Sequence, residues 1–108
     1  PLEDSYNFKD VIITPLSFAR ILESIVTDAN ADKLEGWSSD LLFTFHEYIL
    51  GFVKLNIHAN YRYLFRGIRF SKLTKQRLKL ILPDPSKMKC TLPERIKLRE
   101  LCEFIVEE

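Results

Sequence analysis

Apolar residues recur at helical spacing in three parts of the chain. The first pattern follows Thr14 and Pro15 and consists of Phe18, Ile21, Leu22, Ile25 and Val26. Apolar positions separated by three and four residues form one face of an α-helix. Thr14 can accept a hydrogen bond from a free amide of the first turn, and Pro15 suits the first helical position. The sequence therefore predicts a helix that starts at residue 14 and fades by Asp28.

A second pattern follows Ser38 and Ser39, which are both good helix caps. Its apolar stripe comprises Leu41, Leu42, Phe45, Tyr48, Ile49, Phe52 and Val53. So wide a stripe is typical of a central helix that contacts more than one neighbour. Gly51 within the stripe indicates a close helix crossing, because glycine in a helix is otherwise unfavourable. Trp37 precedes the helix and is expected to pack back onto it as a hydrophobic staple.

The end of this second helix has two interpretations. It either continues through Leu64 and stops at Gly67, or it breaks between Asn56 and Asn60. We favour the break. A continuous helix over residues 39–66 would instead indicate a histone-type arrangement, in which short helices flank a long central one.

Residues 68–82 also have two interpretations. Ser71 could cap a helix over residues 72–82, which would place Lys72, Lys75 and Lys79 on one stripe but would put Arg77 among leucines. Alternatively, apolar and basic residues alternate with period two, which is typical of a hairpin, here turning at residues 74–76. The pattern alone does not decide between a helix and a basic hairpin.

The last helix is signalled at both its start and its buried face. Thr91 and Glu94 have the spacing of a capping box. An apolar face follows, formed by Leu98, Leu101, Cys102 and Ile105. A turn at residues 83–85, which read Pro-Asp-Pro, separates this helix from the ambiguous stretch.

These elements predict a mainly α fold, a small bundle of four to five helices. We expect residues 1–108 to form a single domain, excised from a larger protein, with residues 1–13 as an extended lead-in. The length of 108 residues suits one domain, and 46% hydrophobic and 29% charged residues are close to globular averages. The alternatives are a winged-helix-like α+β domain with the basic hairpin at 68–82 as its wing, and the histone-type arrangement.

The net charge of +1 conceals a strong segregation of charge. Residues 1–50 carry three basic and nine acidic side chains, whereas residues 51–82 carry eight basic and no acidic ones. Residues 83–108 carry five basic and six acidic side chains. Such asymmetry is informative about partners rather than about fold.

The basic block is the main candidate binding site. Its cations are interleaved with aromatic residues, and phosphates need cations while unstacked bases need flat aromatic faces. The candidate residues for nucleic-acid or acidic-partner binding are Lys54, Arg62, Arg66, Arg69, Lys72, Lys75, Arg77, Lys79, Tyr61 and Tyr63. The competing interpretation is that the aromatics are core residues and that the cations only solvate the surface.

Other chemistry finds little support. Asp28, Asn30 and Asp32 alternate as in a calcium loop, but the sequence then lacks the required glycine and glutamate. Zinc ligation by His46, His58, Cys90 and Cys102 has no close ligand pair. Since the chain also lacks a nucleophile elbow and a glycine-rich phosphate loop, we expect no enzyme, no metal and no cofactor. The two cysteines are expected to be reduced.

We therefore expect a non-catalytic binding module of a larger intracellular, nuclear protein. It would present the basic face at residues 54–79 to DNA, RNA or an acidic protein partner. The alternative is a protein-protein interaction or scaffolding domain that binds a partner helix through apolar surface, without nucleic-acid contact. Neither membrane association nor a small-molecule substrate is expected.

Overall fold

The computed structural model describes residues 13–28 and 36–107. Within these ranges the chain forms five α-helices and the short 3-10 helix η2, and it forms no strand. They are α2 (Pro15–Asp28), α3 (Ser39–Leu55), α4 (Tyr61–Leu64), α5 (Lys72–Ile81), η2 (Pro85–Lys87) and α6 (Leu92–Val106). The predicted helical bundle is therefore confirmed. The lead-in at residues 1–12 and the calcium-loop candidates Asn30 and Asp32 lie outside the described residues.

The helix starts follow the local cap signals of the sequence. Thr14 Oγ1 accepts a hydrogen bond from the Ser17 amide at 3.1 Å. Ser38 accepts from the Leu41 amide at 3.2 Å, which fixes the start of α3. At α6 both halves of the predicted capping box form, with Thr91 N to Glu94 Oε1 at 2.9 Å and Glu94 N to Thr91 Oγ1 at 3.3 Å.

The helix that begins near Ser38 breaks between Asn56 and Asn60, as we expected. α3 ends at Leu55, and the Asn56 side chain donates to the Phe52 carbonyl at 2.9 Å. Asn60 then caps α4 by accepting from the Tyr63 amide at 3.3 Å. A continuous helix over residues 39–66 is therefore wrong, and with it the histone-type arrangement. Gly67, at a φ of +81°, supplies the left-handed turn after α4, a conformation that glycine adopts without strain.

The basic hairpin at 68–82 is also wrong, because these residues form a loop and then α5. Ser71 caps α5 by accepting from the Thr74 amide at 3.2 Å. The buried positions of α5 are Thr74, Leu78 and Ile81, which is helical spacing, whereas Leu80 is 60% exposed. The winged-helix alternative is therefore wrong as well, because its wing would have been this hairpin. The period-two alternation was misleading because it counted an exposed leucine as a core residue.

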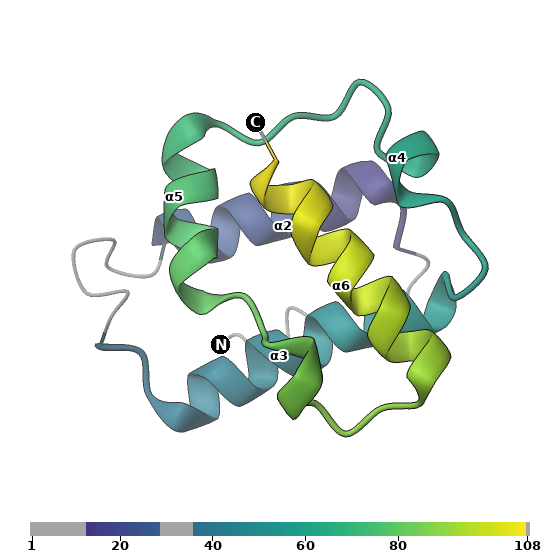
Figure 1. Ribbon diagram of the computed structural model, residues 1–108. Coiled ribbons are helices and arrows are strands. Elements are labelled where there is room, and N and C mark those ends of the chain that lie inside the picture. Colours follow the sequence, from purple (N-terminus) through teal and green to yellow (C-terminus); the bar gives the residue numbers. More distant parts are fainter. Residues whose placement is uncertain (1–12, 29–35, 108) are drawn as a thin grey trace.

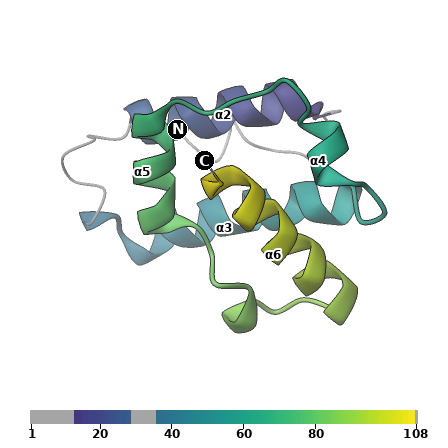
Figure 2. The ribbon, with the colours of Figure 1, turned by 45° about the horizontal axis from the view of Figure 1, so that its top comes forward.

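The helices enclose one aromatic core. Figure 1 shows α6 crossing in front of α2 and α3, and both Figures 1 and 2 show α5 at one end and α4 at the other. α6 packs against α3, α4, α5 and η2, and α5 also packs against α2. Phe18 of α2 stacks on Phe52 of α3 with ring centroids 3.9 Å apart, and Phe65 contacts both rings edge-on. Trp37 packs onto α3 as expected, meeting Phe45 edge-to-face at 5.6 Å.

Candidate basic face

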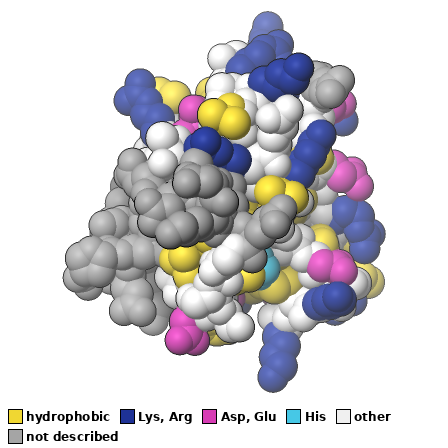
Figure 3. All heavy atoms as spheres, turned by 90° about the vertical axis from the view of Figure 1, so that its left-hand side faces the viewer, with side chains coloured by type: hydrophobic (Ala, Val, Ile, Leu, Met, Phe, Trp, Pro, Cys, Tyr) yellow, Lys and Arg dark blue, Asp and Glu magenta, His cyan; other side chains and the backbone are white. Residues whose placement is uncertain are grey.

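The predicted basic residues separate into two groups in the structure, and Lys54 stands alone, exposed in the last turn of α3. Lys72, Lys75 and Lys79, here called the lysine row, share one face of α5. Together with Gln76 they line an open hollow of about 390 Å³. The sequence predicted this stripe for a helical α5. Figure 3 shows the side of the molecule on which α5 lies, with basic side chains across its upper part and down its right-hand edge.

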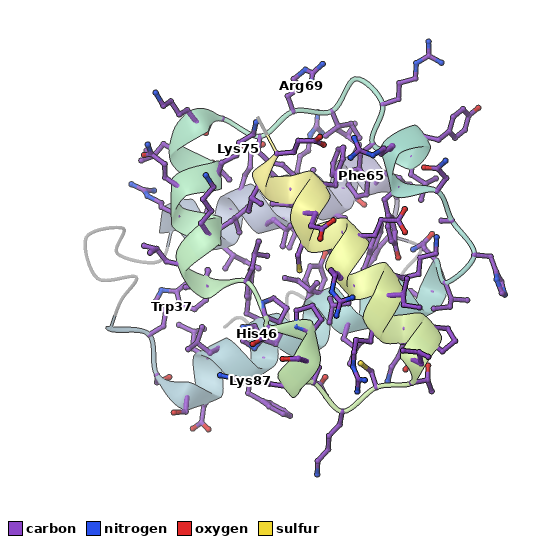
Figure 4. The ribbon with its side chains drawn as sticks, viewed as in Figure 1. Trp37, His46, Phe65, Arg69, Lys75 and Lys87 are labelled. Atoms are coloured by element: carbon purple, nitrogen blue, oxygen red, sulfur yellow. The ribbon has the colours of Figure 1, made fainter. Side chains whose placement is uncertain are left out.

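A recess connects the lysine row to the loop before α5. Arg69 is exposed in this loop and lies with Lys75 and Glu107 around a recess of about 50 Å³. Figure 4 shows Arg69 and Lys75 at one end of the molecule, with the Arg69 side chain pointing outward. His46 and Lys87 lie toward the opposite end. The loop therefore extends the positive surface beyond the first turn of α5.

The second group lies at α4 and is partly neutralised. Arg62 forms a two-pronged ion pair with Glu107, with N–O distances of 3.0 and 3.3 Å. Lys75 Nζ donates to the Glu107 backbone carbonyl at 2.7 Å. The end of α6 therefore engages one cation from each group. No local signal in the sequence foretells these contacts, because 45 and 32 residues separate the partners.

Two of the predicted site residues have structural roles instead. Tyr61 is completely buried, and burial together with the nearby Glu100 carboxylate raises the pKa of its hydroxyl. Its ring is therefore not available to stack on a base. Arg77 is partly buried and donates from Nη1 to the Val26 carbonyl at 3.2 Å, which ties α5 to the end of α2. Of the two predicted tyrosines only Tyr63 is solvent-exposed, at 71%.

Three hydrogen bonds to backbone carbonyls join α5 to its neighbours: two acceptors lie at the ends of α2 and α6, and the third is the carbonyl of Ile81 on α5 itself. Besides Arg77 to Val26 and Lys75 to Glu107, His46 of α3 donates from Nε2 to the Ile81 carbonyl at 2.8 Å. These bonds lie near the start, middle and end of α5. They fix the direction in which the lysine row faces.

A second hollow, of about 450 Å³, lies beside Phe43. The sequence pattern did not indicate Phe43 as a candidate site residue. The hollow is lined by Phe43, His46, Glu47, Leu50, Lys87, Met88 and Lys89 and is here called the Phe43 hollow. Phe43 is 66% exposed although it belongs to α3, the most buried helix. The sequence held one signal for this hollow, because Phe43 is a large aromatic residue that lies outside the apolar stripe of its helix.

The described residues contain no group of three or more His, Cys, Asp or Glu side chains placed to hold a metal ion. Of the four zinc candidates, His46 is bonded to Ile81 and Cys102 Sγ lies 4.0 Å from the Pro83 carbonyl. Cys90 and Cys102 are free thiols. Burial and the Glu103 carboxylate raise the pKa of Cys102 to about 12, which makes this thiol a poor nucleophile at neutral pH.

No protein-family model, curated protein or solved structure matches the chain. Among the described helices none is both long and apolar enough to cross a bilayer. The described residues form two candidate binding surfaces, the basic face and the Phe43 hollow.

Proposed function

We propose that this chain is a non-catalytic module that binds nucleic acid through the lysine row and the adjoining Arg69. The observation that carries the proposal is the shared hollow of Lys72, Lys75 and Lys79 on one helix face. No acidic side chain occurs between residues 51 and 82, and the Glu107 carboxylate near Arg69 and Lys75 is paired with Arg62. The hydrogen bonds that fix α5 support the proposal, because they keep the three lysines on one outward-facing side of the helix.

The physical basis is counterion release. A nucleic acid carries condensed cations, and each phosphate that a lysine or arginine neutralises releases some of them. The logarithm of the affinity therefore falls with the logarithm of salt concentration, with a slope of roughly 0.9 for each duplex phosphate contacted. A basic face that binds phosphates must show this dependence.

The test compares the wild-type chain with a variant in which Arg69, Lys72 and Lys79 are changed to Gln. All three side chains are exposed, so their loss should not unfold the domain. Fluorescence anisotropy with a labelled DNA duplex, repeated over a range of NaCl concentrations, measures the slope. We expect the slope to decrease in magnitude by about 2.7, which is three contacts at about 0.9 each.

A matched control removes the same charge elsewhere. Changing Lys87, Lys89 and Arg99 to Gln also deletes three exposed cations but leaves the lysine row intact. This control should retain nearly the wild-type slope. Equal losses in the two triple variants would contradict a site on α5 and would indicate attraction by net charge alone.

An acidic protein is the competing ligand for a basic face. Poly-L-glutamate offers negative charge without phosphate geometry, so it serves as the competitor in the same assay. We expect it to displace the duplex only at charge concentrations at least about tenfold higher, since its charge density is lower than that of DNA. Displacement at equal charge concentration would favour an acidic protein partner over nucleic acid.

The Phe43 hollow favours a second candidate function, the binding of a partner helix. Phe43, Leu50 and Met88 supply apolar surface, and the hollow is large enough for side chains of a docked helix. Exposed aromatic residues are typical anchors of such interfaces. The lysine row lies on a different helix, so the two functions are compatible.

A displayed library of amphipathic helical peptides tests this second candidate. Peptides selected on the wild-type chain should carry apolar anchors at helical spacing and should bind Phe43→Ser at least about tenfold more weakly. Leu92→Ser is the control, because Leu92 is 63% exposed but does not line the hollow. Selected peptides that bind Phe43→Ser as tightly as the wild type would exclude the hollow as their site.

A further inference from the structure

The aromatic residues of the basic block face the core rather than a ligand. Tyr61, Phe65 and Phe70 have exposed fractions of 0%, 1% and 6%. Phe65 packs against Phe104 of α6 with ring centroids 5.0 Å apart. These three rings cannot stack on a base without unfolding the domain. The sequence suggested cations and stacking rings together, but the structure shows mainly cations at the surface.

The fourth aromatic residue of the block is exposed but lies away from the lysine row. Tyr63 belongs to α4, which lies at the opposite end of the molecule from α5 (Figures 1 and 2). It does not line the hollow of the lysine row or the recess at Arg69. The Tyr63 ring is therefore not placed to stack on a strand bound along the lysine row.

The lysine row has the dimensions of a short run of phosphates. Lys72 and Lys79 are seven residues apart on α5, which corresponds to about 10.5 Å along the helix axis. Each strand of a DNA duplex advances about 3.4 Å per phosphate along the duplex axis, but it also winds around that axis, so successive phosphates lie farther apart and the row spans about two of them. A duplex holds its phosphates at fixed intervals, whereas a single strand must first be ordered.

We infer that the ligand of this face is a nucleic-acid duplex, bound through its phosphate backbone, rather than an unpaired strand. The inference rests on the proposed function and narrows its ligand. Single-strand binders gain much of their affinity from base stacking on aromatic side chains. The described residues that line the hollow of the lysine row include no aromatic side chain, and the aromatic residues at the recess, Phe70 and Phe104, pack into the core. A duplex offers about one charge per 1.7 Å and releases more counterions per phosphate than a single strand, roughly 0.9 against 0.7.

The experiment measures the affinity of the wild-type chain for three labelled probes. They are a mixed-sequence DNA duplex and each of its two separated strands, titrated by fluorescence anisotropy at several NaCl concentrations. We expect the duplex to bind at least about tenfold more tightly than either strand near physiological salt, with the steeper salt dependence. A separated strand that binds as tightly as the duplex, or more tightly, would overturn the inference while leaving nucleic-acid binding intact.

Two variants separate charge from stacking in the same assay. Lys72→Gln combined with Lys79→Gln should weaken duplex binding at least about fivefold. Tyr63→Ala should leave the affinities for all three probes within about twofold of the wild type, because its ring is not part of the site. A selective loss of single-strand affinity in Tyr63→Ala would overturn the inference. Failure of all three probes to bind would overturn the proposed function itself.

Discussion

The ammonium group of Lys97, on α6, makes three contacts: with a backbone carbonyl, with a carboxylate and with an aromatic ring. Its Nζ donates to the Ala59 carbonyl at 2.7 Å, which holds the connection between α3 and α4 against α6. The same Nζ lies 3.2 Å from the Glu100 carboxylate and 5.7 Å from the centroid of the buried Tyr61 ring. We predict that Lys97→Met, which keeps the length of the side chain and removes its charge, destabilises the fold by about 2 kcal/mol.

The magnitude follows from the separate contacts. A hydrogen bond from a charged donor contributes about 1.5–3 kcal/mol. The cation–π contact adds about 0.5–1 kcal/mol at a partly exposed site. The ion pair with Glu100 adds only about 0.3–0.5 kcal/mol, because both side chains are partly exposed and screened by water. The methionine recovers part of this loss, since its unbranched chain stays buried without desolvating an ammonium group.

Urea denaturation followed by circular dichroism measures the free energy of unfolding of Lys97→Met against wild type. The midpoint should fall while the dependence on urea concentration stays constant, and the melting temperature should drop by about 8 °C. Lys87→Met is the control, because Lys87 is exposed on η2 and its replacement should change stability by less than about 0.5 kcal/mol. A similarly small effect at Lys97 would refute the structural role assigned to its ammonium group.

Three further predictions concern the cap of α6, a buried thiol and the end of α6. Thr91→Ala removes one half of the capping box and should lower the free energy of unfolding by about 1 kcal/mol in the same urea assay. Because burial raises the pKa of Cys102 from 9.0 to about 12, the unfolded chain loses this proton first, so stability should fall as pH rises above 9. In Cys102→Ala the free energy of unfolding should fall less steeply above pH 9 than in the wild type. The same dependence of stability on pH in both proteins would contradict a buried thiol at this position. Glu107→Gln removes the ion pair with Arg62 and should strengthen duplex binding about threefold. The control Glu103→Gln removes the same charge from within α6 and should strengthen binding less. Equal gains in the two variants would indicate a general effect of net charge.

The helices themselves were largely predictable because their signals are local. Thr14, Ser38, Ser71 and Thr91 all cap the helices that follow them, and each cap acts within three residues of its own position. The stretch from 68 to 82 was ambiguous because its alternation fits two periods equally well. Only burial resolves it, since the structure places Leu78 in the core and leaves Leu80 in solvent.

The candidate site was only partly predictable, because exposure and pairing depend on tertiary contacts. The lysine row followed directly from helical spacing once α5 was a helix. The engagement of Arg62 by Glu107, and of Arg77 by Val26, joins residues far apart in sequence and has no local signature. The burial of Tyr61 was likewise unreadable, since an aromatic residue among cations suits a binding surface and a core equally well.

The bonds that hold α5 have a consequence for sequence change in the surrounding helices. At Val26, Ile81 and Glu107 the acceptor is a backbone carbonyl, which every amino acid supplies. Replacing the side chain at any of these acceptor positions therefore leaves the acceptor atom in place. Only the three donors, His46, Lys75 and Arg77, depend on residue identity. The hydrogen bonds that orient α5 are therefore sensitive to substitution at these three donors, one of which lies on the neighbouring helix α3, rather than at the acceptor positions.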